Sequence, residues 1–272
     1  MNDHLSKEDY EEPCCPLELH PETKTIPLNA VIEKLDAYLE RREFAAAERH
    51  LRYWAQEAQL CRDFRGKLTV LNEQIGFYRK QDKEAECFCA VKEALALSGT
   101  PDLAGTVTLG TTLINAATAY KAFGKAEEAL PLYVRAREIY ESALPPEDAR
   151  LGGLYNNTAL ALCDLGSYAE AEKLYQKALA VMLRQTHGEA DAAITYLNLA
   201  DLVTAETGIG SCDERIEQYL QKAEELLNTE TLPRDGYYAF VCEKCAPVFG
   251  YYGYFLTEKE VKERAEKIYE GN

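Results

Sequence analysis

Residues 117–136 read ATAYKAFGKAEEALPLYVRA, and residues 159–178 read ALALCDLGSYAEAEKLYQKA. At an offset of 42 positions the two stretches share small residues, one glycine and one tyrosine. The same shift places Asp82 under Gly124 on one side and Gly208 under Gly166 on the other. A fixed period of this length is typical of repeat proteins, in which each unit packs on its neighbours. The sequence therefore predicts an array of similar units.

Each unit is predicted to form two helices, one on either side of its glycine. Apolar residues recur every three or four positions around Gly124 and Gly166, which gives each helix one buried stripe. A glycine that ends the first helix can adopt the left-handed conformation that other residues avoid. Tyr120, Tyr133 and Tyr175 are expected to fill the space between pairs. No stretch is predicted to form a strand.

The predicted fold is all-α, a right-handed α-solenoid of about five antiparallel helix pairs over residues 28–272. Residues 1–27, with many acids and prolines, are expected to form an extended or partly disordered arm. The pairs are predicted at about 28–60, 65–98, 104–143, 149–184 and 190–228, followed by a degenerate capping pair at 236–270.

Three positions depart from the regular unit. Arg42 stands where a turn glycine is usual. Pro247 should kink the first helix of the last pair or end it early, because proline lacks the amide proton. Thr257 and Glu260 have the spacing of a capping box, which predicts a helix start at Thr257.

The stretches at 117–136 and 159–178 resemble the tetratricopeptide repeat. Its signature is a small residue, an aromatic three positions on and a turn glycine four further, and Ala117, Tyr120 and Gly124 follow that order. The 42-residue spacing and the stretch AEKLYQKAL at 171–179 are similar to the longer repeats of kinesin light chains. The similarity is close over 108–204 and looser outside, and no heptad segment accompanies it.

Composition and charge exclude several classes of function. The 272 residues include 30 Lys and Arg against 46 Asp and Glu, a net charge of −16 that repels phosphate groups. We therefore expect no nucleic-acid binding and no docking on a membrane. The first residues do not read as a secretory signal, and no segment reads as a membrane span. Nine scattered cysteines indicate reduced thiols, so a cytoplasmic location is predicted.

Motifs for catalysis and metal binding are weak. No Glu-x-x-His or His-Glu-x-x-His motif occurs, and the glycines around 208–213 lack the third glycine of a phosphate loop. Cys242 and Cys245 have metal-like spacing and could bind zinc together with Cys14 and Cys15. Small buried residues at helical spacing are the simpler explanation. We predict no enzymatic activity and no cofactor.

The resemblance implies that the first helices of successive pairs line a concave groove in which a partner segment lies. Asparagines would form a column in this groove and pair with a peptide backbone, since Asn both donates and accepts hydrogen bonds. Alternatively, they bond only to neighbouring helices. Basic residues on the groove side of two adjacent pairs would hold a carboxylate, or would be solvated or paired locally. The candidate peptide-binding residues are Asn115, Asn157 and Asn198 in one column, Asn156 beside it, and Arg79, Lys80 and Lys121.

The sequence predicts a non-catalytic adaptor that binds a protein or peptide segment. Three alternatives remain: a sensor of a short signalling peptide in a bacterial regulatory pathway, a cysteine-based zinc protein, and a unit that forms a homodimer through its terminal helices. The tyrosines of the last pair either pack within it or form a contact patch; they are Tyr237, Tyr238, Tyr251, Tyr252 and Tyr254.

Overall fold

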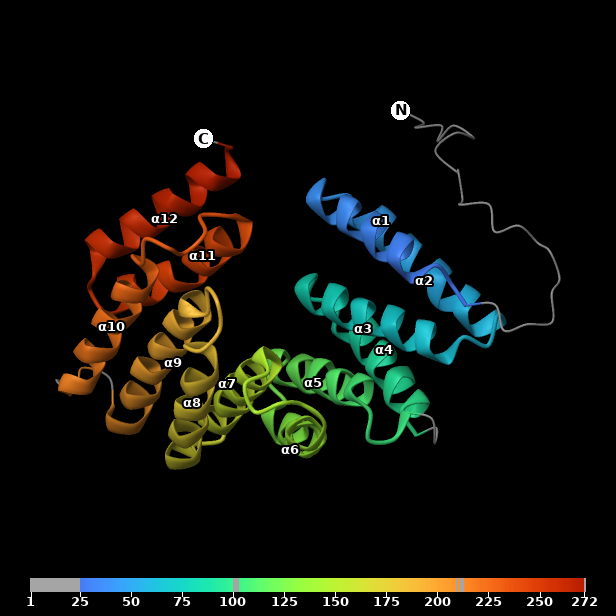
Figure 1. The fold of residues 1–272 in the computed structure, drawn as a ribbon, viewed down its shortest axis with the longest axis horizontal. Helices are drawn as coiled ribbons and strands as arrows, with labels where there is room; N and C mark the ends of the chain where they lie inside the picture. Colours follow the sequence, from blue (N-terminus) through green and yellow to red (C-terminus); the bar gives the residue numbers. More distant parts are fainter. Residues whose placement is uncertain (1–24, 100–102, 209, 211–212, 272) are drawn as a thin grey trace. The chain divides into compact units, whose positions relative to one another are not determined.

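The computed structural model describes residues 25–99, 103–208, 210 and 213–271, so most of the predicted N-terminal arm lies outside the described residues. The described residues form twelve α-helices and no strand (Figure 1). The predicted all-α class is confirmed.

The chain divides into two compact units, Met1–Val70 and Leu71–Asn272. The first unit contains α1 (Leu28–Glu40), α2 (Phe44–Leu60) and the beginning of α3 (Phe64–Lys80). Val31 and Leu35 of α1 are buried in its core together with Leu51 and other apolar residues of α2.

The second unit begins within α3 and contains the remaining helices as antiparallel pairs (Figure 1). In each of the last four pairs, the two helices pack along their length. The second helices α4, α6 and α8 also pack on the first helix of the next pair. The first helices α5, α7, α9 and α11 contact one another in sequence. The helices are α4 (Glu84–Leu97), α5 (Val107–Ala122), α6 (Ala126–Ala143), α7 (Ala149–Asp164), α8 (Tyr168–Met182), α9 (Glu189–Thr207), α10 (Glu214–Leu227), α11 (Gly236–Tyr251) and α12 (Phe255–Tyr269).

The spacing of small residues explains how closely these helices pack. Alanines at the repeated positions of α6 and α8, such as Ala129 and Ala171, have no exposed surface. Tyr133 and Tyr175 are also fully buried and fill the space beside them, whereas Tyr120 is half-buried. Small and large residues therefore alternate in the core as the repeat pattern predicts.

The turns after α1, α3, α5 and α7 use one left-handed residue each. Gly124 and Gly166 have φ of 73° and 72°, as predicted, and the equivalent residues Arg42 and Asp82 have φ of 57° and 55° without being glycine. A side chain with a Cβ is strained in this conformation, although Asp tolerates it better than Arg.

Replacing Arg42 with glycine is expected to raise the free energy of unfolding by about 0.5–1 kcal/mol. Relief of the left-handed strain outweighs the greater freedom of glycine in the unfolded chain. The midpoint of thermal unfolding, followed by circular dichroism, measures the change. Arg49→Gly is the control, because Arg49 is solvent-exposed and lies in the middle of α2. Glycine at this helical position should lower the free energy of unfolding by about 1 kcal/mol. Equal destabilisation by both variants would contradict the assignment of strain to Arg42.

In the last pair, the early end that was one of two expected effects of Pro247 does not occur, and the predicted helix start at Thr257 is wrong. Helix α11 does not end early at Pro247 but continues to Tyr251. Helix α12 begins at Phe255, two residues before the predicted start, and no side chain caps it. Instead of capping, Thr257 donates a hydrogen bond from Oγ1 to Oε1 of Glu224 in α10 at 2.9 Å. This contact between helices is available only in the folded array, so the local capping pattern did not reveal it.

Candidate protein-binding surface

The first helices of the last four pairs each leave one stripe of side chains accessible to solvent. On α7 the stripe is Arg150, Gly153, Asn157, Leu160 and Asp164, at the three- and four-residue spacing of one helix face. Equivalent stripes occur on the neighbouring first helices. We call all four stripes the first-helix face; the other three are Thr108, Thr111, Asn115, Thr118 and Ala122 on α5, Asp191, Ile194, Asn198, Asp201 and Ala205 on α9, and Tyr237, Phe240, Lys244, Pro247 and Tyr251 on α11.

Asn115, Asn157 and Asn198 occupy the same central position of their stripes, at separations of 42 and 41 residues. Two of them also bond to a neighbouring helix. Nδ2 of Asn115 donates to Oδ1 of Asn72 in α3 at 3.2 Å, and Nδ2 of Asn198 donates to Oδ1 of Asn156 in α7 at 3.0 Å. Part of each amide is therefore used for packing between repeats.

Asn156 and Asn157 have different surroundings although they are adjacent. Asn156 is buried, and its Oδ1 also accepts a hydrogen bond from the hydroxyl of Thr195 at 3.1 Å. Asn157 is half-buried, and within the described residues its side chain makes no hydrogen bond. Asn157 thus has both a donor and an acceptor available to a ligand.

Asn72 occupies in α3 the position that Asn156 occupies in α7, and it was missed in the sequence. It lies 43 residues before Asn115, one more than the repeat period, and its Nδ2 donates to Oγ1 of Thr112 at 3.0 Å. Extending the position of Asn156 back by two periods of 42 residues would have found it.

The three predicted basic residues do not form one free patch. Nζ of Lys121 forms an ion pair with Oδ2 of Asp164 on the next first helix at 3.3 Å. Arg79 is half-buried near the end of α3, and Lys80 is exposed as its last residue. Neither makes an ion pair within the described part of the chain. Lys121 therefore has the local pairing considered as the alternative, and a ligand carboxylate would have to compete with Asp164.

The α11 end of the first-helix face is aromatic. Tyr237, Phe240 and Tyr251 expose 50, 44 and 60% of their surface, and the rings of Tyr237 and Phe240 stack with centroids 6.2 Å apart. The Tyr237 hydroxyl donates to the carboxylate of Asp191 on α9; burial and this charge raise the pKa of Tyr237. Nζ of Lys244 lies 5.6 Å from the centre of the Phe240 ring. The stripe thus presents ordered rings to solvent.

The tyrosines of the last pair divide between the two roles considered for them. Tyr238 is 1% exposed, and its hydroxyl donates to the carbonyl oxygen of Leu227 at 3.0 Å, so it packs within the structure. Tyr237 and Tyr251 are largely exposed. Their spacing with Phe240 and Lys244 along one helix face is the sequence signal that identifies the stripe.

The cysteines of α11 belong to the core. Cys242 and Cys245 are 0 and 1% exposed, and burial raises the pKa of both thiols. Burial thus favours the neutral thiol over the thiolate that binds metals. Cys14 and Cys15 lie outside the described residues. Among those that are described, no group of three or more His, Cys, Asp or Glu side chains is placed to hold a metal ion.

The apolar stretches of the described helices are all too short, or too polar, to cross a membrane.

Comparison with known proteins identifies the repeats. Two family models of the tetratricopeptide repeat match residues 109–149 and 150–229. The structure of BtubC (BKLC) from P. vanneervenii is similar, with a TM-score of 0.57 and 19% identity over 84% of this chain and 90% of that one. The TPR-like repeats of a P. anserina protein named as a kinesin light chain give a TM-score of 0.53 and 18% identity, over 74% of this chain and 94% of that one. No curated protein matches the sequence.

At these identities the structural similarity shows the fold, which is an all-α solenoid of helix pairs. Tetratricopeptide repeats are typically non-catalytic scaffolds for protein–protein interaction. Residues 109–229 are tetratricopeptide repeats, and the helix-pair fold of the chain is similar to that of the TPR-like repeats in the P. anserina structure.

Proposed function

We propose that this protein is a non-catalytic adaptor that binds an extended segment of a partner protein on its first-helix face. The observation that carries the proposal is the column of asparagines at one position of successive first helices. In this column, Asn157 has a donor and an acceptor without a partner in the described part of the chain. An amide can pair with the backbone of a bound segment whatever its side chains are.

The neighbours of Asn157 support this role. Gly153 has no side chain, and a Cβ built there would meet nothing within 4 Å. Thr111 and Thr118 on α5 are small, although their hydroxyls already lie 2.7 and 3.0 Å from those of Tyr140 and Tyr133. A peptide backbone can therefore approach the asparagine column closely, and the exposed rings of α11 can supply apolar contact.

Replacing Asn115, Asn157 and Asn198 together with alanine is expected to reduce capture of the partner from an extract of the native cell at least tenfold. The captured protein is quantified by mass spectrometry against the unmodified chain. The control variant should leave capture unchanged. It replaces with alanine three exposed amides on second helices, which are Gln56, Gln176 and Gln218. Equal capture by both triple variants would overturn the proposal.

Asn157→Ala separates binding from stability. The triple variant also removes the bonds of Asn115 and Asn198 to neighbouring helices, so it can lower the unfolding midpoint. Asn157 makes no such bond within the described residues, and its replacement should weaken capture with little change in the midpoint. A loss of capture that follows only the unfolding midpoint would contradict a direct role of the column.

We further propose that the protein acts in the cytoplasm and does not bind nucleic acid. The six cysteines in the described residues are free thiols, as expected in a reducing compartment. The net charge of −16 opposes contact with phosphate backbones.

A further inference from the structure

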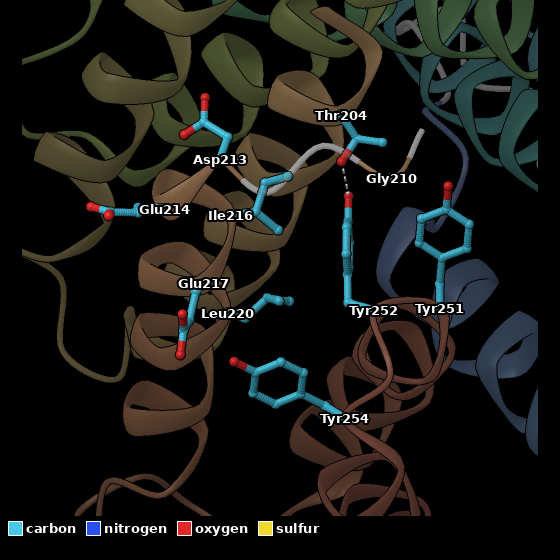
Figure 2. A pocket seen from close by; sticks show the side chains of 10 residues that line it. All are labelled: Thr204, Gly210, Asp213, Glu214, Ile216, Glu217, Leu220, Tyr251, Tyr252 and Tyr254. Atoms are coloured by element: carbon cyan, nitrogen blue, oxygen red, sulfur yellow. Dashed lines mark hydrogen bonds between the residues drawn. The ribbon is translucent and has the colours of Figure 1, made fainter. Parts of the chain in front are cut away.

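A cleft of about 680 Å³ lies between α10 and the connection from α11 to α12 (Figure 2). Its floor is apolar, because Ile216 and Leu220 extend from α10 toward the connection and are 9 and 2% exposed. Tyr251, Tyr252 and Tyr254 form the opposite wall. The size is that of a small-molecule or side-chain pocket.

The aromatic wall is held in place by contacts of Tyr252 with α9 and with the ring of Tyr251. The Tyr252 hydroxyl donates to Oδ1 of Asp201 at 2.9 Å and lies 2.8 Å from the hydroxyl of Thr204. The rings of Tyr251 and Tyr252 meet edge to face with centroids 5.0 Å apart. Because these contacts already order the rings, a ligand would not have to offset the entropy lost when side chains become immobile on binding.

The charge of the cleft has one sign. Asp213, Glu214 and Glu217 line it, and none of its described lining residues is basic. Asp213 is already paired with Arg215, whose Nη2 lies 2.8 Å from its Oδ2. Glu214 and Glu217 are exposed and make no ion pair within the described residues. These two carboxylates therefore supply the uncompensated negative charge.

The carboxylate of Glu217 also acts on the wall. The pKa of Tyr254 is raised by burial and by the negative charges of Glu217 and Glu224. The negative potential of these groups thus reaches the tyrosine ring at the cleft. An aromatic face beside carboxylates over an apolar floor is the combination that receives a long cationic side chain.

We propose that this cleft binds an arginine or lysine side chain of a partner protein. The alkyl part of the side chain packs on Ile216 and Leu220, and its cationic end lies against the rings of Tyr252 and Tyr254 within reach of Glu217. An acidic side chain is repelled, and a purely apolar one leaves the carboxylates unpaired. The site shares only Tyr251 with the first-helix face, so it does not depend on the function proposed for that face.

The test uses the full chain and a dye-labelled peptide, Ala-Arg-Ala-Arg-Ala, whose binding is followed by fluorescence anisotropy at 0.15 M salt. The unmodified protein is expected to bind this peptide and not Ala-Glu-Ala-Glu-Ala. The double replacement Glu214→Gln with Glu217→Gln should weaken binding at least tenfold. Tyr254→Leu, which keeps an apolar side chain, should weaken it at least fivefold.

A second double variant controls for the overall charge of the protein. Glu127→Gln with Glu128→Gln removes two exposed charges from α6 and gives the same net charge as the cleft variant. Its affinity should stay within twofold of the unmodified chain, and circular dichroism should show equal helicity for all variants. Equal weakening by the two double variants, or no binding by the unmodified protein, would overturn the proposal. The triple asparagine variant should bind the arginine peptide normally, which separates this site from the first-helix face.

Discussion

Replacing Gly188 with alanine is expected to destabilise the protein by about 3 kcal/mol. Gly188 precedes α9 with φ of −72° and ψ of −5°, which any residue can adopt, so the constraint is space. A Cβ at this position would lie 1.9 Å from the carbonyl oxygen of Met182, the last residue of α8. A backbone oxygen cannot rotate away as a side chain does, so α8 and the start of α9 would have to separate.

Gly153→Ala is the matched control for this substitution. Gly153 lies in the interior of α7, where a Cβ would meet no atom within 4 Å. The same change should therefore stabilise the protein by about 1 kcal/mol, because alanine favours the helix. Urea unfolding followed by circular dichroism measures both effects. A Gly188→Ala protein as stable as the unmodified chain would show that the α8–α9 turn adjusts at no cost.

Replacing Tyr133 with alanine is expected to cost about 4 kcal/mol of unfolding free energy. Tyr133 has no exposed surface and lies in α6 among the small residues of the repeat. Its hydroxyl lies 3.0 Å from that of Thr118 on α5, and burial raises the pKa of Tyr133 to about 12. Loss of the ring would leave a cavity between α5 and α6 that backbone atoms cannot fill.

Tyr133→Phe tests how much of this effect comes from the ring. Phenylalanine keeps the ring and loses only the contact with Thr118, so the expected cost is about 1 kcal/mol. Unfolding in urea, with the same signal for both variants, gives the comparison. Equal costs for the alanine and phenylalanine variants would show that the hydroxyl contact, and not packing, holds α5 and α6 together.

The repeat pattern predicted the helix pairs because it records which face of each helix is buried. Ala129 and Ala171 mark close approaches between helices, and Gly124 and Gly166 mark turns, so local residues were sufficient. The start of α12 was not predictable in this way. Thr257 bonds to Glu224 of another helix instead of capping its own, and no local pattern encodes that choice.

The positions of the candidate asparagines on their helices could be predicted from the repeat in the same way. The period of the repeat brought Asn115, Asn157 and Asn198 to one position of their helices. The period could not show which asparagine side chains form hydrogen bonds to a neighbouring helix. Those bonds depend on how far neighbouring helices are shifted along their axes relative to one another. A shift of 42 residues pairs Asn198 with Asn156 and leaves Asn157 without a partner in the described residues.

The cleft at α10 was beyond the reach of the sequence for a different reason. Its floor comes from α10, and its wall comes from the connection after α11, more than 30 residues later. Their contact depends on how the last pair packs beside α10, so comparing the repeat units with one another could not bring these two segments together. The tyrosines were noticed in the sequence, but their acidic neighbours on α10 were not.

The first-helix face changes its chemistry from one end to the other. Hydroxyl and amide groups such as Thr108 and Asn115 line α5, whereas the rings of Tyr237 and Phe240 and the ammonium group of Lys244 line α11. A chain segment lying across all four helices would meet two unlike ends. Reversing its N-to-C direction would exchange its contacts with each end, so the surface would select one direction of the bound chain.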